Sequence, residues 1–163
     1  MSMFSDVTGE AGSSAPATAP LRRYFEVLAC VARADGVYGD RERILIEAAA
    51  RACELSPASL EAVVSLADPS RQVDVECVLQ EAARSSDVST IAETLRDAYV
   101  LASIDEDVAP SEHYVLERYL AHAGYDDVSR SVLLQWARTA AEHHLDGLKL
   151  LAELGGVRQP CSP

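Results

Sequence analysis

The stretch that decides the fold is Leu28–Leu55, LACVARADGVYGDRERILIEAAARACEL, together with a similar stretch at Ala98–Tyr125, AYVLASIDEDVAPSEHYVLERYLAHAGY. In each, the apolar spacing indicates the end of one amphipathic helix, a short loop and the start of the next helix. Aligned without a gap, 70 residues apart, they match an aspartate and a glutamate in each copy, and the apolar positions largely coincide. The two stretches therefore predict two similar helix pairs.

Helical periodicity continues on both sides of these stretches, and no segment shows the alternation of a β-strand. Seven helices are expected, at about 21–34, 40–54, 57–67, 74–84, 88–104, 110–123 and 129–154. Gly36 and Gly124 are placed to end two of them in left-handed caps, and Gly147 is a point where the last can break or bend. The predicted fold is all-α, a quasi-symmetric array of helix pairs with the fourth helix between two similar halves.

Composition divides the chain into one domain and two tails. Residues 1–20 are rich in Ser, Ala, Gly, Thr and Pro without a period, which predicts a disordered tail. Residues 21–154 form the predicted helical domain, long enough for a substantial core. Residues 155–163 are expected to be a loose C-terminal tail.

The formal charge of −12 constrains the partners of this protein. Phosphate repels such a surface, so nucleic-acid binding is not expected. Cations or proteins with basic surfaces fit better, although an acidic face that only keeps the protein soluble fits equally.

Cysteine usage and hydropathy point to a cytoplasmic protein. The four cysteines form no CxxC pair, and three of them fall in helical segments, where a free cysteine is typically a small buried apolar residue. The N-terminus lacks the pattern of a signal peptide. No apolar run approaches the roughly 18 residues of a transmembrane helix.

The matched carboxylates are the candidate site. Asp35 and Asp105 fall where core-facing stripes of their helices end, and Glu42 and Glu112 fall where the next stripes begin. In each half the Asp and the Glu are expected to converge at one end of a helix pair. Asp107 adds a further carboxylate to the second copy.

Two interpretations of these acids remain at this point. The first is capping, in which each Glu accepts the N–H at the start of its helix and each Asp accepts loop N–H groups. The second is a divalent cation, because carboxylate oxygens suit Ca²⁺, Mg²⁺ or Mn²⁺. The spacing is not that of an EF-hand, since Ile46 and Leu116 occupy the positions of its bidentate Glu.

The run ARADGVYGDRERILIEAAA, residues 32–50, resembles the characteristic motif of the TerB family of tellurite-resistance-associated helical proteins. The resemblance covers roughly residues 21–153, with matches at Ala34, Asp35, Gly36 and Glu42 and again at Asp105 and Glu112. The second copy departs from the family pattern at Ile104 and Glu106, which replace Ala and Gly. The resemblance implies two helix bundles sharing a central helix, an acidic metal site, and a role in tellurite or related stress responses.

No motif for catalysis occurs in the sequence. There is no HExxH, GxSxG or P-loop, and no cysteine lies beside a candidate base. His113 and Glu117 are expected to form an i,i+4 surface pair. Trp136 is assigned to the core or a groove, with an aromatic partner site as the alternative.

The leading hypothesis is a non-enzymatic protein that binds a divalent cation. Its predicted ligands are Asp35, Glu42, Asp105, Asp107 and Glu112. The alternative is a scaffold or interaction module in which the acids only brace the loops and an acidic face docks a basic partner.

Overall fold

The computed structural model describes residues 19–103 and 108–155, and these form seven α-helices and no strand. The helices are α1 (Ala19–Ala32), α2 (Asp40–Ala52), α3 (Pro57–Ala67), α4 (Val75–Ser85), α5 (Val88–Ala102), α6 (Pro110–His122) and α7 (Asp127–Gly155). The all-α prediction is confirmed for these ranges. The predicted tails at 1–20 and 155–163 lie almost wholly outside them, and α1 begins two residues before the predicted domain.

The local signals at the helix ends act as expected. Gly36 and Gly124 take the left-handed conformation after α1 and α6, with φ of 85° and 89°. Ser56 caps α3, its hydroxyl accepting the N–H of Ser59 at 3.3 Å, and Pro57 occupies the first helical position. These positions terminate or start helices because glycine tolerates positive φ and proline lacks an N–H.

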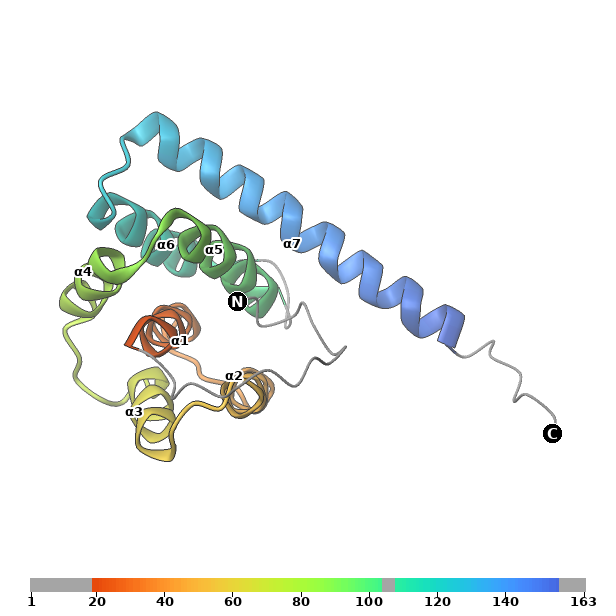
Figure 1. Ribbon diagram of the computed structural model, residues 1–163, viewed down its shortest axis with the longest axis horizontal. Coiled ribbons are helices and arrows are strands. Elements are labelled where there is room, and N and C mark those ends of the chain that lie inside the picture. The colour runs from red at the N-terminus through yellow and green to blue at the C-terminus, as the bar shows by residue number, and fades with distance from the viewer. Residues whose placement is uncertain (1–18, 104–107, 156–163) are drawn as a thin grey trace.

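Helix α1 lies at the centre of the body (Figure 1). Its residues 24–32 are buried on every side, and it contacts α2, α3, α4, α5 and α6. A helix that is apolar around its whole circumference must be enclosed in this way. The fourth helix, which the sequence placed between the two halves, contacts one helix of each, α1 and α6.

Polar groups inside the body are paired. The Asp97 side chain on α5 is fully buried, accepts the Tyr24 hydroxyl of α1 at 2.7 Å, and pairs with Arg96 at 2.9 Å. Glu26, buried on α1, pairs with Arg22 and Arg23 at 2.8 and 2.6 Å. Because an unpaired buried charge would cost several kcal/mol, these pairs hold α1 and α5 in one orientation.

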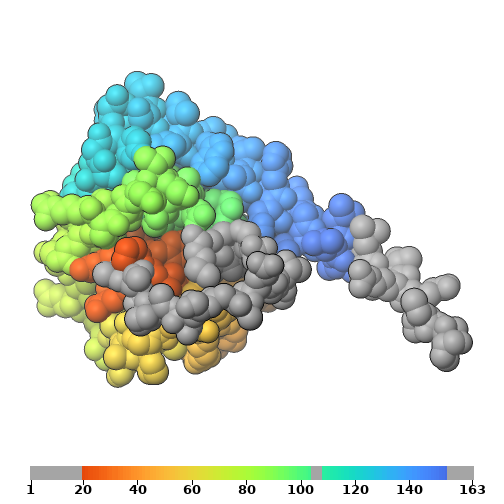
Figure 2. All heavy atoms as spheres, viewed as in Figure 1, coloured from red at the N-terminus to blue at the C-terminus, as the bar shows by residue number. Residues whose placement is uncertain are grey.

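Helix α7 packs on the body through Leu134, Ala137 and Ala141 and then continues past it (Figures 1 and 2). The prediction of a break at Gly147 is wrong, because α7 runs unbroken through it, and a single glycine lowers helix stability by only about 1 kcal/mol. Trp136 is 47% exposed on α7, so its assignment to the core is also wrong.

The cysteines differ from one another in burial. Cys30 is buried, Cys53 is half-buried and Cys77 is exposed, so the expectation of three buried thiols is right for one of them. Burial raises the pKa of the Cys30 thiol to about 12. At neutral pH this thiol therefore stays protonated and behaves as a small apolar side chain.

Four helix boundaries among α1–α3 recur 70 residues later among α5–α7. The pairs are the ends of α1 and α5 at Ala32 and Ala102, the starts of α2 and α6 at Asp40 and Pro110, their ends at Ala52 and His122, and the starts of α3 and α7 at Pro57 and Asp127. Backbone conformation follows the same spacing, because Glu54 has a φ of 55° where Gly124 has 89°.

The pair Glu54 and Gly124 predicts opposite effects of substitution. Gly124→Ala should lower the free energy of unfolding by about 1 kcal/mol, because an L residue is disfavoured in the left-handed region. An added Cβ there meets no atom within 4 Å, so packing should not contribute. Glu54→Gly should raise it by about 0.5 kcal/mol through relief of the same strain. Urea denaturation measures both, and a stabilising Gly124→Ala would contradict the assignment.

A surface ion-pair network joins α4 to α6. Glu76 of α4 accepts two hydrogen bonds from Arg118, both at 2.9 Å, and lies 2.7 Å from His122 Nε2. These partners lower the pKa of the Glu76 carboxyl to about 2. The network therefore stabilises the fold only while Glu76 is ionised.

Acid should remove this stabilisation. The folded pKa of Glu76 lies below its ordinary value, so its contribution is complete above that value and is lost as the pH falls toward about 2. Because the Glu76 side chain is 48% exposed, screening limits the contribution to about 0.5–1 kcal/mol. Glu76→Gln should lower the unfolding free energy at pH 7 and not at pH 2, whereas Glu61→Gln, on the exposed surface of α3, should show no such difference.

Candidate functional site

The predicted acids fall in two loops and the first turns of two helices. Asp35 is exposed in the α1–α2 loop, and Glu42 is half-buried in the first turn of α2. Glu112 occupies the same place in α6 and is only 6% exposed. Asp105 and Asp107 lie outside the described residues, so their placement relative to the other three is not part of the geometry that follows.

Each described acid accepts a backbone N–H. Glu42 Oε2 accepts from Gly39 at 2.8 Å, and Glu112 Oε2 accepts from Ala109 at 2.7 Å. Asp35 Oδ1 accepts the N–H of Val37 at 2.8 Å, closing its loop. These are the contacts of the capping interpretation, and they satisfy donors that a helix start leaves without an intrahelical partner.

Glu112 also lies in the electrostatic field of the other corner. Burial raises the pKa of its carboxyl, the Ala109 N–H lowers it, and the negative charges of Asp35 and Glu42 raise it further. Contact between α1 and α6 brings these groups together across 70 residues of sequence. The sequence paired the acids within each half, and the structure brings a carboxylate of the second half toward both carboxylates of the first.

As they stand, these carboxylates fit a hard divalent cation by donor chemistry but not by donor number. Carboxylate oxygens are the preferred ligands of Ca²⁺, Mg²⁺ and Mn²⁺. Within residues 19–103 and 108–155, however, no three His, Cys, Asp or Glu side chains are grouped so as to hold a metal ion. A complete coordination shell would therefore need a further donor or a rearrangement of the three acids.

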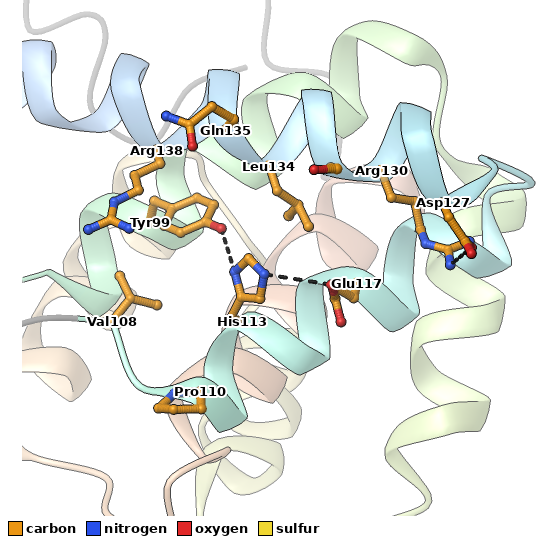
Figure 3. Close-up of a pocket in the computed structure, with 11 residues that line it drawn as sticks. Tyr99, Val108, Pro110, His113, Glu117, Asp127, Arg130, Leu134, Gln135 and Arg138 are labelled. Carbon is orange, nitrogen blue, oxygen red and sulfur yellow. Dashed lines mark hydrogen bonds and ion pairs between the residues drawn. The ribbon is translucent and has the colours of Figure 1, made fainter.

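A cavity of about 740 Å³ lies between α5, α6 and α7 (Figure 3). The Tyr99 hydroxyl and His113 Nδ1 are 2.8 Å apart, and His113 Nε2 lies 3.7 Å from Glu117. The predicted pairing of His113 with Glu117 is thus confirmed, but Tyr99 was missed. No local signal could have revealed it, because Tyr99 projects from another helix.

The polar groups of this cavity form a line that can hold a proton in place. Burial raises the pKa of Tyr99 to about 12, so its hydroxyl stays protonated at neutral pH. The hydroxyl can then donate to His113 Nδ1, which leaves the Nε2 proton directed at Glu117. Arg130 is held by Asp127 and by the Tyr125 carbonyl, the latter at 2.8 Å.

A second cavity, of about 790 Å³, lies between α2 and α3. Nine of its lining positions have a counterpart 70 residues later in the lining of the first cavity. The nine are Tyr38, Arg43, Glu47, Pro57, Leu60, Glu61, Val64, Ser65 and Asp68. Among the counterparts only Glu117 keeps the residue type, so the two cavities agree in position and differ in chemistry.

Comparison with protein-family models, curated proteins and solved structures gave no match to this chain. Among the helices described, none combines the length and apolarity needed to cross a membrane. The functional assignment therefore depends on the geometry and charges of the site.

Tyr99→Phe should lower the free energy of unfolding by about 1 kcal/mol, because it removes the bond to a ring nitrogen of His113 from a partly buried position. Tyr114→Phe is the matched control, since Tyr114 is 57% exposed on α6, and its effect should stay within about 0.5 kcal/mol. A double-mutant cycle with His113→Ala measures the coupling. Equal losses from Tyr99→Phe in both backgrounds would show that the hydroxyl acts independently of His113.

Proposed function

We propose that this protein is a TerB-like, non-enzymatic helical module that binds a divalent cation and acts in a tellurite or related stress response. The observation that carries the proposal is the position of Glu112. Its carboxylate is 6% exposed and lies in the field of two further carboxylates from another part of the chain. The five predicted acids, Asp35, Glu42, Asp105, Asp107 and Glu112, are the proposed ligands.

The energetics of Glu112 support a cation. Burial and two neighbouring negative charges both disfavour its ionised form. A bound Ca²⁺, Mg²⁺ or Mn²⁺ would compensate all three charges at once, and its binding energy would stabilise the folded chain. The same three acids bridge the α1–α2 corner and the start of α6, so the ion would join the two halves.

An internal repeat is part of the proposal. The common spacing of helix boundaries, of the two left-handed positions and of the two cavity linings supports an origin of α1–α3 and α5–α7 from one unit. Helix α4, which contacts α1 and α6, would then be the helix that the two bundles share.

The test is calorimetric titration of the full chain and of Glu112→Gln with Ca²⁺, Mg²⁺ and Mn²⁺. Glutamine keeps an oxygen to accept the Ala109 N–H, so the cap survives while the charge is removed. We expect binding to the unmodified chain, at least tenfold weaker binding to Glu112→Gln, and no change for Glu117→Gln, a half-exposed carboxylate on the same helix. Absence of heat and of thermal stabilisation with all three ions would refute the cation.

The pH dependence without ions gives a second expectation. Because the folded protein holds the Glu112 proton to higher pH than the unfolded chain, this residue lowers stability as the pH rises from the ordinary Glu pKa through the raised one. Glu112→Gln should remove that loss. Bound cation should reverse it, since the ion favours the ionised carboxylate.

The second candidate is a scaffold whose acids brace loops and whose acidic face docks a basic partner. Three hydrogen bonds favour it, those from Gly39, Ala109 and Val37 to the carboxylates. It predicts that Glu112→Ala lowers stability by about 1 kcal/mol through loss of the cap, with or without divalent ions present. The cation proposal instead predicts a loss that grows with ion concentration.

A further inference from the structure

Helix α7 has an apolar face that the body does not cover. We call it the outer face of α7, and it consists of Val128, Val132, Trp136, Thr139, His143, Gly147, Leu150 and Leu151. Val128, Val132, Leu150 and Leu151 are 75, 64, 55 and 66% exposed. Monomers rarely leave a contiguous apolar stripe of this kind in water, so it marks an interaction surface.

The outer face lies opposite the face that packs on the body. Its residues recur every three or four positions, and the buried Leu134, Ala137 and Ala141 fall on the other side of the helix. A second helix can therefore lie along the outer face without meeting α5 or α6. Figure 2 shows the C-terminal part of α7 projecting from the body.

The last part of α7 has little support from its own chain. Residues 146–153 are all exposed, and Leu148, Leu150 and Leu151 are among them. Isolated helical segments of this length are marginal in water, and most helical stability comes from packing of an apolar face. A partner along the outer face would supply that packing.

Charge identifies the partner as another copy of the chain. The whole chain carries −12, so two copies repel each other over most of their surface. Helix α7 is close to balanced, with three basic and four acidic residues, Arg130, Arg138, Lys149, Asp127, Glu142, Asp146 and Glu153. Self-association is therefore least opposed along this helix.

The order of residues on the outer face favours an antiparallel pair. Its bulkiest side chain, Trp136, lies toward one end and its glycine, Gly147, toward the other. The register that seats Trp136 on Gly147 of a second copy also sets Val132 against Leu150 and Thr139 against His143. It places Arg138 between Glu142 and Asp146 of the other copy, so charge and shape agree in one register.

We propose that the protein forms a two-fold symmetric dimer through antiparallel packing of the outer faces of α7, with Trp136 of each copy seated on Gly147 of the other. Each copy contributes the same surface, as a two-fold interface requires. The large apolar side chains at one end of the face cover the leucines at the other.

Sedimentation of the full chain tests the proposal. We expect a concentration-dependent dimer, and Trp136→Glu should raise its dissociation constant by at least roughly 30-fold, as expected for a central aromatic anchor. Ile44→Glu, at a 59% exposed position on α2, is the matched control and should leave the dimer unchanged. Trp136 is the single tryptophan, so its emission should shift to the red on dilution.

Disulfide cross-linking tests the register in a background with Cys77 and Cys161 replaced by serine. Val132→Cys with Leu150→Cys should cross-link two chains, because these positions are about 27 Å apart along one helix and cannot bridge within it. Val132→Cys alone should not cross-link. A monomer at millimolar concentration, or a dimer indifferent to Trp136→Glu, overturns the proposal. Cross-linking by Val132→Cys alone overturns the antiparallel register.

Discussion

Complete enclosure of α1 is the constraint on which the rest of the structure depends. Residues 24–32 leave no face for solvent, so helices must cover α1 on all sides, and five of them do. The polar groups on α1 are tolerated because each has a partner, the Tyr24 hydroxyl at Asp97 and Glu26 between two arginines. The covering helices are fixed around one axis, and the loops that join them meet at the ends of α1.

The acidic corner is a consequence of that arrangement. The loop after α1 carries Asp35, α2 begins with Glu42 in its first turn, and α6 contacts α1 with Glu112 directed inward. Capping gives each carboxylate a local purpose, while burial and mutual repulsion make Glu112 costly as an ion. The proposed cation resolves this conflict, because it offsets the repulsion without removing the caps.

Helix α7 combines two roles along one element. Its first half closes the body over α5 and α6 through Leu134, Ala137 and Ala141, and its outer face continues past the point where the body ends. Helix α3, its counterpart at a spacing of 70 residues, has 11 residues where α7 has 29. The added length has no function in packing this chain on itself, which is why the outer face is assigned to a second copy.

The sequence alone determined the helical class, most helix boundaries and the glycines that end α1 and α6, because these depend on local periodicity and backbone sterics. It also identified Asp35, Glu42 and Glu112, since each follows from its position along a helix. Only the tertiary structure decided that Glu112 faces the other two acids, that Tyr99 meets His113, and that Trp136 points to solvent. Those facts depend on contacts between helices distant in sequence, and a helical pattern shows which residues share a face but not what that face meets.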